Sequence, residues 1–397
     1  MRVLAVRILR LDHHVQLRAI PGPPGERKGR VRIAMVGTRG VPARYGGFET
    51  AVEEIGRRLV ARGHEVVVYC RGDDPSREHL GMRRVVLPAV HSRTTETLSH
   101  SALSMAHLVA RRADVALVFN AANAPLLPIL RAARIPVAVH VDGLEWKRGK
   151  WGPTGRRYYL AAERLAVRWA DALIADAVGI QDYYRERYGV PSRFIPYGAP
   201  LLEAPALHRL REIGLDAGRY HLAVARLEPE NHVDVVLRGY LASSCEQPLV
   251  VVGSAPYPGT HVDEVNRLAA TDVRVRMLGG VWDQELLDAL YAGASCYLHG
   301  HSVGGTNPSL LRALGAGAPV VAFDVDFNRE VVGDAGLFFA DDAEVTAALK
   351  QVEADPADAR ERGDAGRAAV AQRYCWDDVA TGYEDLCRRL VAGEPQA

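Results

Sequence analysis

The sequence lacks the features that would tie it to a membrane span, to nucleic acid or to an oxidising compartment. No apolar run approaches the roughly 18 residues of a membrane-spanning helix. The 49 basic and 48 acidic residues nearly cancel, whereas a dedicated nucleic-acid binder normally carries a basic excess. The cysteines are scattered, odd in number and without a C-x-x-C pair, which favours a reducing compartment, the cytoplasm, over a disulfide framework or a zinc site. They are Cys70, Cys245, Cys296, Cys375 and Cys387.

The composition is that of a folded chain of several domains. At roughly 150 residues per domain, 397 residues predict two or three domains. Apolar residues make up 48% and charged residues 24%, so sizeable cores can form and global disorder is excluded. The 37 glycines, without low complexity, indicate many tight turns and close backbone approaches to ligands.

The N-terminal segment, residues 1–30, differs from the rest. Its apolar character is interrupted by Arg2, Arg7 and Arg10, so it lacks the unbroken apolar stretch of a signal peptide. It ends in the linker-like sequence PGPPG. We interpret it as a tail, a linker or a misassigned start; an amphipathic arm that touches the membrane is the alternative.

From residue 31 onward, short apolar runs alternate with helical patterns. Residues 48–63 follow the first run and place Val52, Ile55 and Leu59 on one helical face. This βαβ alternation predicts a parallel sheet covered by helices on both faces. The strands expected in this first series are Arg32–Val36, Glu65–Cys70, Val115–Phe119, Pro136–Val141 and Ala172–Ala175.

A second series of the same kind begins after residue 200. Two such series predict two doubly wound domains that face each other across a cleft, residues 31–198 and 199–375. A last helix, within 376–397, would cross back to the first domain. The strands expected in the second series are Tyr220–Ala225, Leu249–Val252, Val273–Leu278, Ser295–Leu298 and Pro319–Phe323. Ligands of such sheets bind beyond the carboxyl ends of the strands, so the loops there are the candidate sites.

Two of these loops belong to the first domain. Residues 37–48, GTRGVPARYGGF, follow a strand and open a helix, so the backbone N–H groups around Gly46 and Gly47 would face an anion at the positive helix end. An ordinary glycine turn would look the same. Residues 139–151, VHVDGLEWKRGKW, set carboxylates beside aromatic rings, which suits sugar hydroxyls and apolar sugar faces. A solvated surface loop is the alternative, with His140 as a core histidine.

The other two loops belong to the second domain. Arg226 follows its first strand and suits bidentate contact with a phosphate, although Glu228 or Glu230 would also pair with it. Residues 299–312, HGHSVGGTNPSLLR, run from strand through glycine loop to helix, so Gly304, Gly305 and Thr306 would present backbone N–H groups to a diphosphate. This loop is the most specific of the four. Asp324-Val-Asp326 and the pair His299 and His301 are weak as metal ligands.

Four motifs in order, VGTRGVPARYGGFE, VDGLEWKRGKW, ARLEPEN and HSVGGTNPSLL, resemble glycosyltransferase family 4, which has the GT-B fold. The resemblance is strongest to the subgroup often described as rhamnosyltransferases. It implies a nucleotide-sugar donor held mainly by the second domain, an acceptor held mainly by the first, retention of anomeric configuration and no obligatory metal or cofactor. It also implies a glycan, lipid-linked or small-molecule acceptor, and work at the inner face of the membrane or in the cytoplasm.

The sequence departs from the family pattern at two positions. The family has an arginine and, six residues on, a lysine at the diphosphate; here Arg226 is followed by His232. The family also has a ribose-binding glutamate where this chain has Arg312, which can only donate hydrogen bonds. A second family glutamate corresponds to Gly304, which is normal for the subgroup.

We therefore predict a glycosyltransferase with Arg226 and Asp142 as catalytic residues, Asp142 contacting the donor or acceptor sugar. The alternatives are a catalytically silent protein of the same fold that binds a nucleotide or a partner, and an epimerase or phosphorylase. The predicted substrate-binding residues are Gly46, Gly47, Glu145, Trp146, His232, Gly304, Gly305, Thr306, Asn307, Ser309 and Arg312.

Overall fold

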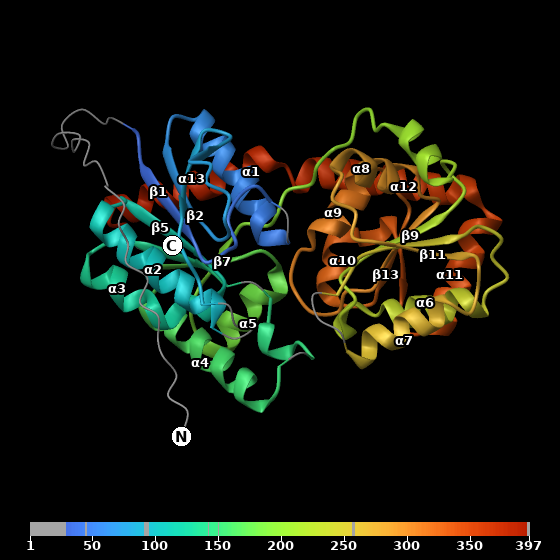
Figure 1. Cartoon of the computed structure of the whole chain (residues 1–397), viewed down its shortest axis with the longest axis horizontal. Coiled ribbons are helices and arrows are strands. Elements are labelled where there is room, and N and C mark those ends of the chain that lie inside the picture. The colour runs from blue at the N-terminus through green and yellow to red at the C-terminus, as the bar shows by residue number, and fades with distance from the viewer. Residues whose placement is uncertain are drawn as a thin grey trace, which may run out of the picture. The chain divides into compact units, whose positions relative to one another are not determined.

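The computed structural model describes residues 29–43, 46–90, 95–141, 143–149, 151–255 and 259–394. Most of the segment expected to be a tail, residues 1–28, and the candidate Asp142 lie outside these ranges. Residues 31–397 form one compact unit that contains two α/β halves, each built around its own sheet (Figure 1). None of the described helices is long and apolar enough to cross a membrane.

The first half contains an eight-stranded sheet in the order β3-β4-β2-β1-β5-β6-β7-β8, parallel throughout except for the β3–β4 pair. Its strands are β1 (Arg32–Val36), β2 (Glu65–Cys70), β3 (Glu78–His79), β4 (Met82–Val86), β5 (Val115–Phe119), β6 (Val137–His140), β7 (Ala172–Ala175) and β8 (Arg193–Phe194). Its helices are α1 (Gly47–Ala61), α2 (Glu96–Arg111), α3 (Leu127–Ala132), α4 (Pro153–Trp169) and α5 (Val178–Tyr188), with 3₁₀ turns η1 (Ala121–Leu126) and η2 (Glu145–Lys147).

The second half contains a six-stranded parallel sheet in the order β11-β10-β9-β12-β13-β14. Its strands are β9 (His221–Val224), β10 (Leu249–Val252), β11 (Val275–Gly279), β12 (Cys296–His299), β13 (Val320–Phe323) and β14 (Leu337–Phe339). Its helices are α6 (Val233–Ala242), α7 (Thr260–Ala269), α8 (Gln284–Gly293), α9 (Pro308–Gly315), α10 (Asp326–Val332), α11 (Asp342–Ala354) and α12 (Pro356–Arg373), and α13 (Trp376–Ala392) ends the chain. The 3₁₀ turns are η3 (Leu207–Ile213), η4 (Pro229–Asn231) and η5 (Gly333–Ala335).

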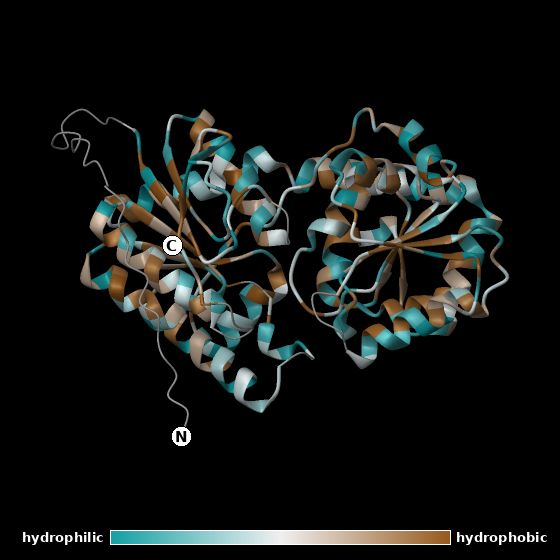
Figure 2. Cartoon of the chain, viewed as in Figure 1, coloured by the Kyte–Doolittle hydropathy of each residue, from teal (hydrophilic) through white to brown (hydrophobic). Residues whose placement is uncertain are grey.

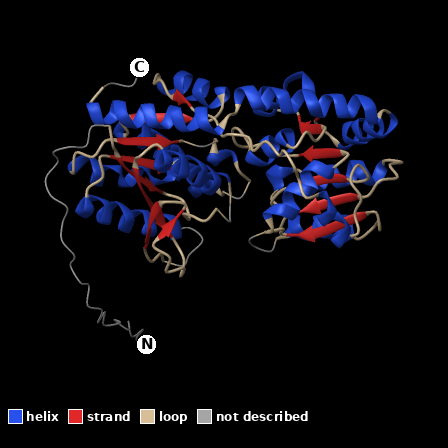
Figure 3. Cartoon of the chain, turned by 90° about the horizontal axis from the view of Figure 1, so that it is seen from above, coloured by secondary structure: helices blue, strands red, loops and turns tan. Residues whose placement is uncertain are grey.

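In each half the strands form a layer between helices, and the apolar colour concentrates on the strands and on the helix faces turned toward them (Figures 2 and 3). This confirms the predicted pair of doubly wound α/β domains. One strand was placed wrongly: the run expected to start at Val273 starts at Val275, and Val273 is 98% exposed. An apolar residue in the preceding turn extended the run in the sequence without being buried.

Helix α1 shows how the sequence produces the packing. Val52, Ile55 and Leu59 recur at helical spacing and are fully buried against the sheet. Gly56 is on the same helix, and a Cβ there would lie 2.2 Å from the sulfur of Met82 in β4. The missing side chain therefore lets α1 lie close to the sheet, with the amino end of the helix beside the loop that follows β1.

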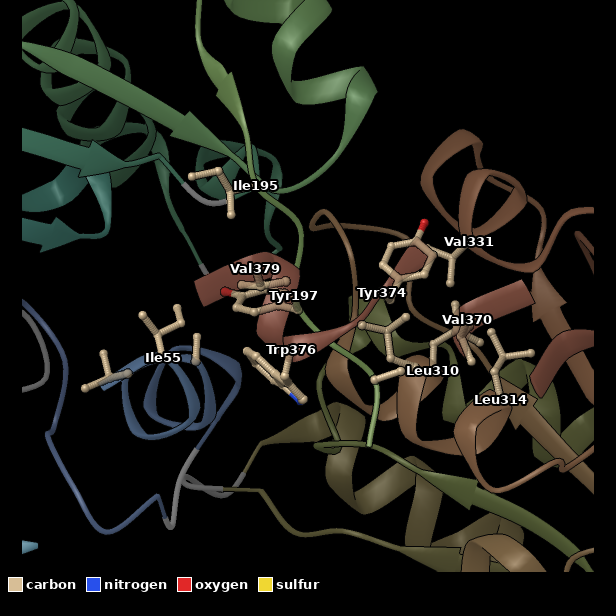
Figure 4. Close-up of a cluster of buried hydrophobic side chains, with 14 of the residues drawn as sticks. Ile55, Ile195, Tyr197, Leu310, Leu314, Val331, Val370, Tyr374, Trp376 and Val379 are labelled. Atoms are coloured by element: carbon tan, nitrogen blue, oxygen red, sulfur yellow. The ribbon is translucent and has the colours of Figure 1, made fainter. Parts of the chain in front are cut away.

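The junction between the halves is apolar and continuous with the core. One buried cluster includes Ile55 and Ile195 of the first half, Leu310 of the second half and the joining residues Tyr374 and Trp376 (Figure 4). Helix α13 lies on α1, where charged side chains of the two helices pair at 3.0 Å. The C-terminal helix thereby returns to the first half.

Candidate functional site

The glycine loops that follow β1, β6 and β12 meet at the carboxyl ends of the two sheets. A Cβ on Gly47, at the start of α1, would lie 3.0 Å from Pro308, at the start of α9. A Cβ on Gly143 would lie 2.3 Å from the Cα of Gly304. Contacts this close leave no room for side chains, so glycine is required where loops of the two halves touch.

The loop after β9 joins the same group. The guanidinium of Arg148, in the loop after β6, lies 3.8 Å from the carboxylate of Glu230. The backbone carbonyl of Glu230 accepts a hydrogen bond of 2.9 Å from the N–H of Ser302, in the loop after β12. All four loops selected from the sequence thus form one connected set.

The first loop is held by a glutamate of its own helix. Gly46 caps α1 in an extended conformation and has no side chain to bond the first turn. Glu49 is 6% exposed and accepts a hydrogen bond of 2.9 Å from the backbone N–H of Arg39. Glu49 therefore fixes the backbone of the loop as well as adding negative charge near the positive helix end.

In the second loop, charged and aromatic side chains interact with one another. Glu145 lies 2.5 Å from the guanidinium of Arg148 and accepts a longer hydrogen bond of 3.3 Å from the indole N–H of Trp151. Trp146 is half-buried, and the ammonium of Lys147 lies 5.6 Å from the centre of its ring. The predicted sugar-binding residues Glu145 and Trp146 are thus on this loop, but Glu145 is already engaged by neighbours.

His140, which ends β6, is a core histidine. Its ring is 2% exposed and stacks at 5.8 Å on the rings of both Phe119 and Tyr197. Burial alone lowers the pKa of His140 to about 3, so the ring is neutral at physiological pH. This is the alternative that the sequence left open. Asp142 follows two residues later, outside the described residues.

Arg226 lies in the loop just after β9, and its side chain is partly exposed. Its side chain is 38% exposed, and its Nη1 lies 3.8 Å from the carboxylate of Glu228. Its carbonyl accepts a hydrogen bond of 2.8 Å from the side-chain amide of Asn231, which fixes the backbone at this point. At this distance the ion pair with Glu228 is loose, so the guanidinium retains donors for a ligand.

His232, the residue where the family has lysine, is used in holding the fold. Its backbone is left-handed, with φ of 46°, and it forms the N-cap of α6. The ring Nδ1 bonds the carbonyl of Gly300 at 2.8 Å, and the ring stacks on Phe323 at 4.2 Å. This imidazole is therefore fixed in place, unlike a flexible lysine side chain.

The fourth loop is anchored in the first half. The hydroxyl of Thr306 is 3% exposed and donates to the backbone carbonyl of Asp176, which follows β7. A Cβ on Gly305 would lie 2.3 Å from the Asp176 carboxylate. The side chain of Thr306 is thus turned toward the protein, and only backbone groups of Gly304–Thr306 are left to meet a diphosphate.

The start of α9 is capped by its own side chains. Asn307 accepts hydrogen bonds from the N–H of Ser309 at 3.0 Å and from the Ser309 hydroxyl at 2.8 Å. That hydroxyl in turn accepts one of 2.9 Å from Tyr297 in β12. Asn307 and Ser309 therefore set the position of the helix end, as an N-cap does.

The positive charges of the site surround His301. Burial lowers the pKa of His301 well below its usual value, and the nearby His299, Arg226, Arg148 and His232 add to the effect. Arg148 comes from the first half and Arg226 from the second, so cations of both halves act on the same buried ring. Arg148 is paired with Glu145 at 2.5 Å, so the loosely paired, partly exposed Arg226 is the better donor for an anion.

Several buried polar atoms of these loops have no hydrogen-bond partner among the described residues. Buried polar groups are nearly always bonded, so a cluster of exceptions needs an explanation, and an absent ligand or water is one. These atoms are Nε2 of His299, Nδ1 of His301, Oε2 of Glu228 and both carboxylate oxygens of Glu230.

Arg312 is turned toward α8. Its guanidinium donates a hydrogen bond to the carboxylate of Asp288, and both side chains are about one-fifth exposed, 21% and 22%. Asp288 also accepts a hydrogen bond of 2.9 Å from Gln284. The residue that breaks the family pattern is therefore part of an ion pair between α8 and α9.

Possible metal ligands lie elsewhere. The carboxylate of Asp324 is engaged by Arg329 at 2.5 Å and 2.7 Å. Within the described ranges, one group of three ligand types lies close together: His221, Cys245 and Glu353. His221 starts β9, at the sheet edge opposite the glycine loops, and its Nε2 lies 2.9 Å from a Glu353 oxygen.

Two residues of the site were not predicted as site residues. Arg148 lies in the second loop but was not selected as a binding residue, and Asp176, directly after a predicted strand, was not selected at all. No spacing singles them out, because their partners Glu230 and Thr306 come from the other half of the chain. Arg148 and Asp176 reach the site only through the packing of one half against the other.

Two family models match the chain, one on each half. Residues 46–198 match the glycosyl transferase 4-like domain, and residues 218–355 match glycosyl transferases group 1. Together with the two-sheet fold, these matches show that the chain belongs to the glycosyltransferases with the GT-B fold. The two family models do not distinguish the subgroup described as rhamnosyltransferases.

Known proteins similar to this chain are of the same kind. The glycogen synthase of Mycobacterium tuberculosis is 26% identical over 423 aligned positions, covering 92% of this chain and 96% of the relative. The O-antigen chain mannosyltransferase B of Escherichia coli is 30% identical, covering 46% of this chain and 49% of the relative.

Solved structures share the fold. The sucrose-phosphate synthase of Thermosynechococcus elongatus has a TM-score of 0.78 at 21% identity, covering 91% of this chain and 99% of that one. HepE of Anabaena in complex with UDP-glucose has a TM-score of 0.74 at 17% identity, covering 90% and 100%.

Proposed function

We propose that the chain transfers a sugar from a nucleotide-diphosphate sugar to an acceptor hydroxyl, with retention of configuration and without a metal. The observation that carries this proposal is the meeting of four loops from both halves around buried polar atoms that lack hydrogen-bond partners among the described residues. The fold is shared with HepE, whose structure contains UDP-glucose, and with a sucrose-phosphate synthase.

The main catalytic effect would be stabilisation of the leaving diphosphate. Arg226 would donate charge-assisted hydrogen bonds to it. The backbone N–H groups of Gly304–Thr306 and the Gly46–Gly47 turn at the start of α1 would add donors that are fixed before the reaction begins. Arg148 is a further cation beside the same buried His301.

The reaction would need no side-chain base. The acceptor hydroxyl would attack the anomeric carbon from the face that the diphosphate leaves. The new carbon–oxygen bond forms as the bond to the phosphate oxygen breaks, and that phosphate oxygen takes the hydroxyl proton. Asp142 would contact the donor or acceptor sugar near the reacting carbon. In the same loop, Glu145 and Trp146 would bind sugar hydroxyls and a sugar face.

The sugar donor would bind mainly to the second half, and the acceptor would bind mainly to the first half. dTDP-rhamnose is the first donor to test, because the motifs resemble the rhamnosyltransferase subgroup. The acceptor would be a glycan, a lipid-linked sugar or a small molecule, reached in the cytoplasm or at the inner face of the membrane.

The test is release of nucleoside diphosphate from a panel of nucleotide sugars with candidate acceptors. Proton NMR of the product would then report the anomeric configuration. Activity should survive EDTA, because the Asp324 carboxylate is engaged by Arg329. Complete loss on chelation, restored by a divalent ion, would revive Asp324 and Asp326 as metal ligands.

A second candidate function is binding without transfer. The observation that favours it is the ion pair of Arg312 with Asp288, which leaves no carboxylate at position 312 for a ribose. Such a protein would bind a nucleoside diphosphate in calorimetry, yet release none from any nucleotide sugar in the panel.

A further inference from the structure

A second basic site lies on the first half, away from the glycine loops. A shallow hollow lies between α2 and the strands β1, β2 and β4, and its interior has about 10 Å³ of room, which is the space of one water molecule. Arg32 starts β1 and Arg111 ends α2, so the hollow extends to the amino edge of the sheet. The glycine loops leave the opposite, carboxyl edge. The residues lining the hollow are Arg32, Ala34, Val67, Tyr69, Arg83, Val85, His107, Leu108, Arg111, Arg112 and Ala113.

Strand alternation produces this arrangement. Ala34 pairs with Val67 and Val67 pairs with Arg83 in the parallel register, so these side chains share one face of the sheet. Arg32 and Tyr69, each two residues from one of them, lie on that face as well. Helix α2 covers it, but the small side chains of Ala34 and Ala113 leave the space unfilled.

The floor of the hollow is a hydrogen-bonded pair. The hydroxyl of Tyr69 lies 3.0 Å from Nδ1 of His107. Burial raises the pKa of Tyr69 to about 12, so the phenol stays protonated, and the tautomer of His107 decides which of the two groups donates. Desolvation and the neighbouring arginines lower the pKa of His107, which keeps the ring neutral.

Arg32 binds two backbone carbonyls at the carboxyl end of α2 and so offsets part of the negative charge there. Its Nη1 donates to the carbonyls of Arg111 and Arg112 at 2.9 Å each, and its Nε pairs with Glu65 at 3.0 Å. The last carbonyls of a helix normally carry partial negative charge and would repel an anion. With these carbonyls bonded, the end of α2 no longer opposes one.

Arg83 and Arg111 are the cations left over. Neither takes part in an ion pair within the described residues, although Glu78 is the register partner of Arg83 in the β3–β4 pair. The charges that act on both Tyr69 and His107 come from Arg32, Arg83 and Arg111.

We propose that the mouth of this hollow is an anion site that binds a phosphate group, with Arg83 and Arg111 as its charged donors. Guanidinium forks suit phosphate oxygens, and the phosphate would lie at the mouth because the interior has room for one water molecule only. A free phosphate and an anionic lipid headgroup offer the same group. The site is separate from the sugar-transfer site and does not depend on its chemistry.

The test is calorimetric titration of the full chain with inorganic phosphate. The variant Arg83→Gln with Arg111→Gln should bind phosphate at least about tenfold more weakly, because charge-assisted hydrogen bonds are lost. A matched control removes the same charge elsewhere: Arg360→Gln with Arg389→Gln, two exposed arginines without an ion pair within the described ranges. Thermal unfolding checks that each variant folds.

Further arms identify the site and the source of the anion. Phosphate binding should persist in Arg226→Ala, since Arg226 belongs to the other edge. Vesicle flotation then compares binding of the chain to phosphatidylcholine vesicles with and without phosphatidylglycerol. Arginine-dependent binding to the anionic vesicles identifies a headgroup, and phosphate binding alone identifies a soluble ligand. No phosphate binding, binding lost with Arg226→Ala, or equal loss in the control overturns the proposal.

Discussion

The glycine loops of the two halves share one layout, strand, loop and helix, but they are stabilised differently. After β1, α1 begins at Gly46, which has no capping side chain, and Glu49 holds the loop through the N–H of Arg39. After β12, Asn307 caps α9 and Thr306 is tied to the other half. The first helix end therefore has no capping side chain and a buried carboxylate nearby, whereas the second is fixed by its own side chains.

This difference indicates a division of labour. The second-half loop has its backbone set before any ligand arrives, which is the condition for electrostatic preorganisation. The first-half loop completes the site by contact, as Gly47 does against Pro308. We therefore expect the second half to dominate donor binding.

The largest effect is expected at Arg226, whose loose pair with Glu228 leaves donors for the diphosphate. Arg226→Ala should lower kcat by about 10²–10³-fold, the usual loss for one preorganised donor. Arg238→Ala is the control, since Arg238 is also a paired arginine of the second half. Steady-state kinetics measure both variants, and near-normal turnover of Arg226→Ala would exclude its role.

The contact between the halves is tested at Gly143. A Cβ there would meet the backbone of Gly304 at 2.3 Å, so Gly143→Ala should keep the loops apart. Misplacement of about 1 Å can cost about 10²-fold in rate. Gly152→Ala is the matched control, because nothing lies within 4 Å of its added Cβ. Equal rates for the two variants would show that this contact is not needed.

The donor preference of the second half is sharpened at position 312. The variant Arg312→Glu with Asp288→Asn places a carboxylate where the family has one, without a repelling or competing charge at position 288. Nucleoside diphosphate binding should tighten by about 1.5–3 kcal/mol, one hydrogen bond to a charged group. Weaker binding in calorimetry would mean that Arg312 itself serves as a ligand.

The smallest effect concerns the buried histidine of the first half. The pKa of His140 is about 3 in the fold, below the usual 6.5, so the unfolded chain binds a proton first as pH falls. His140 therefore costs about 2 kcal/mol of stability between pH 7 and pH 5. His140→Phe should lose that much less in urea unfolding over this range. Parallel pH profiles of both chains would contradict the assignment.

Most of the fold was readable because buried parallel strands are continuous apolar runs. Five of the strands begin and end where the sequence indicated, among them Glu65–Cys70 and Leu249–Val252. The strands β3, β4, β8 and β14 were not predicted, and of these the two-residue strands β3 and β8 carry no such run. The start of β11 was predicted two residues too early because Val273 is apolar but exposed.

The sequence predicted which loops form the site, but it did not predict which side chains in those loops are available to a ligand. The strand-to-helix glycine loops were found because ligands of such sheets bind there. Side-chain hydroxyls and amides that looked available, as in Thr306 and Asn307, turned out to bond within the protein. Arg148 and Asp176 were missed as site residues since their roles depend on the other half.

Calorimetric titration with UDP, dTDP, GDP and ADP, on the unmodified chain and on Arg226→Ala, decides whether the second half holds a donor diphosphate. At least one nucleotide should bind the unmodified chain, and Arg226→Ala should weaken that nucleotide by about tenfold or more, because a charge-assisted contact is removed. Failure of all four to bind, or equal affinity for both chains, would contradict a donor site built around Arg226.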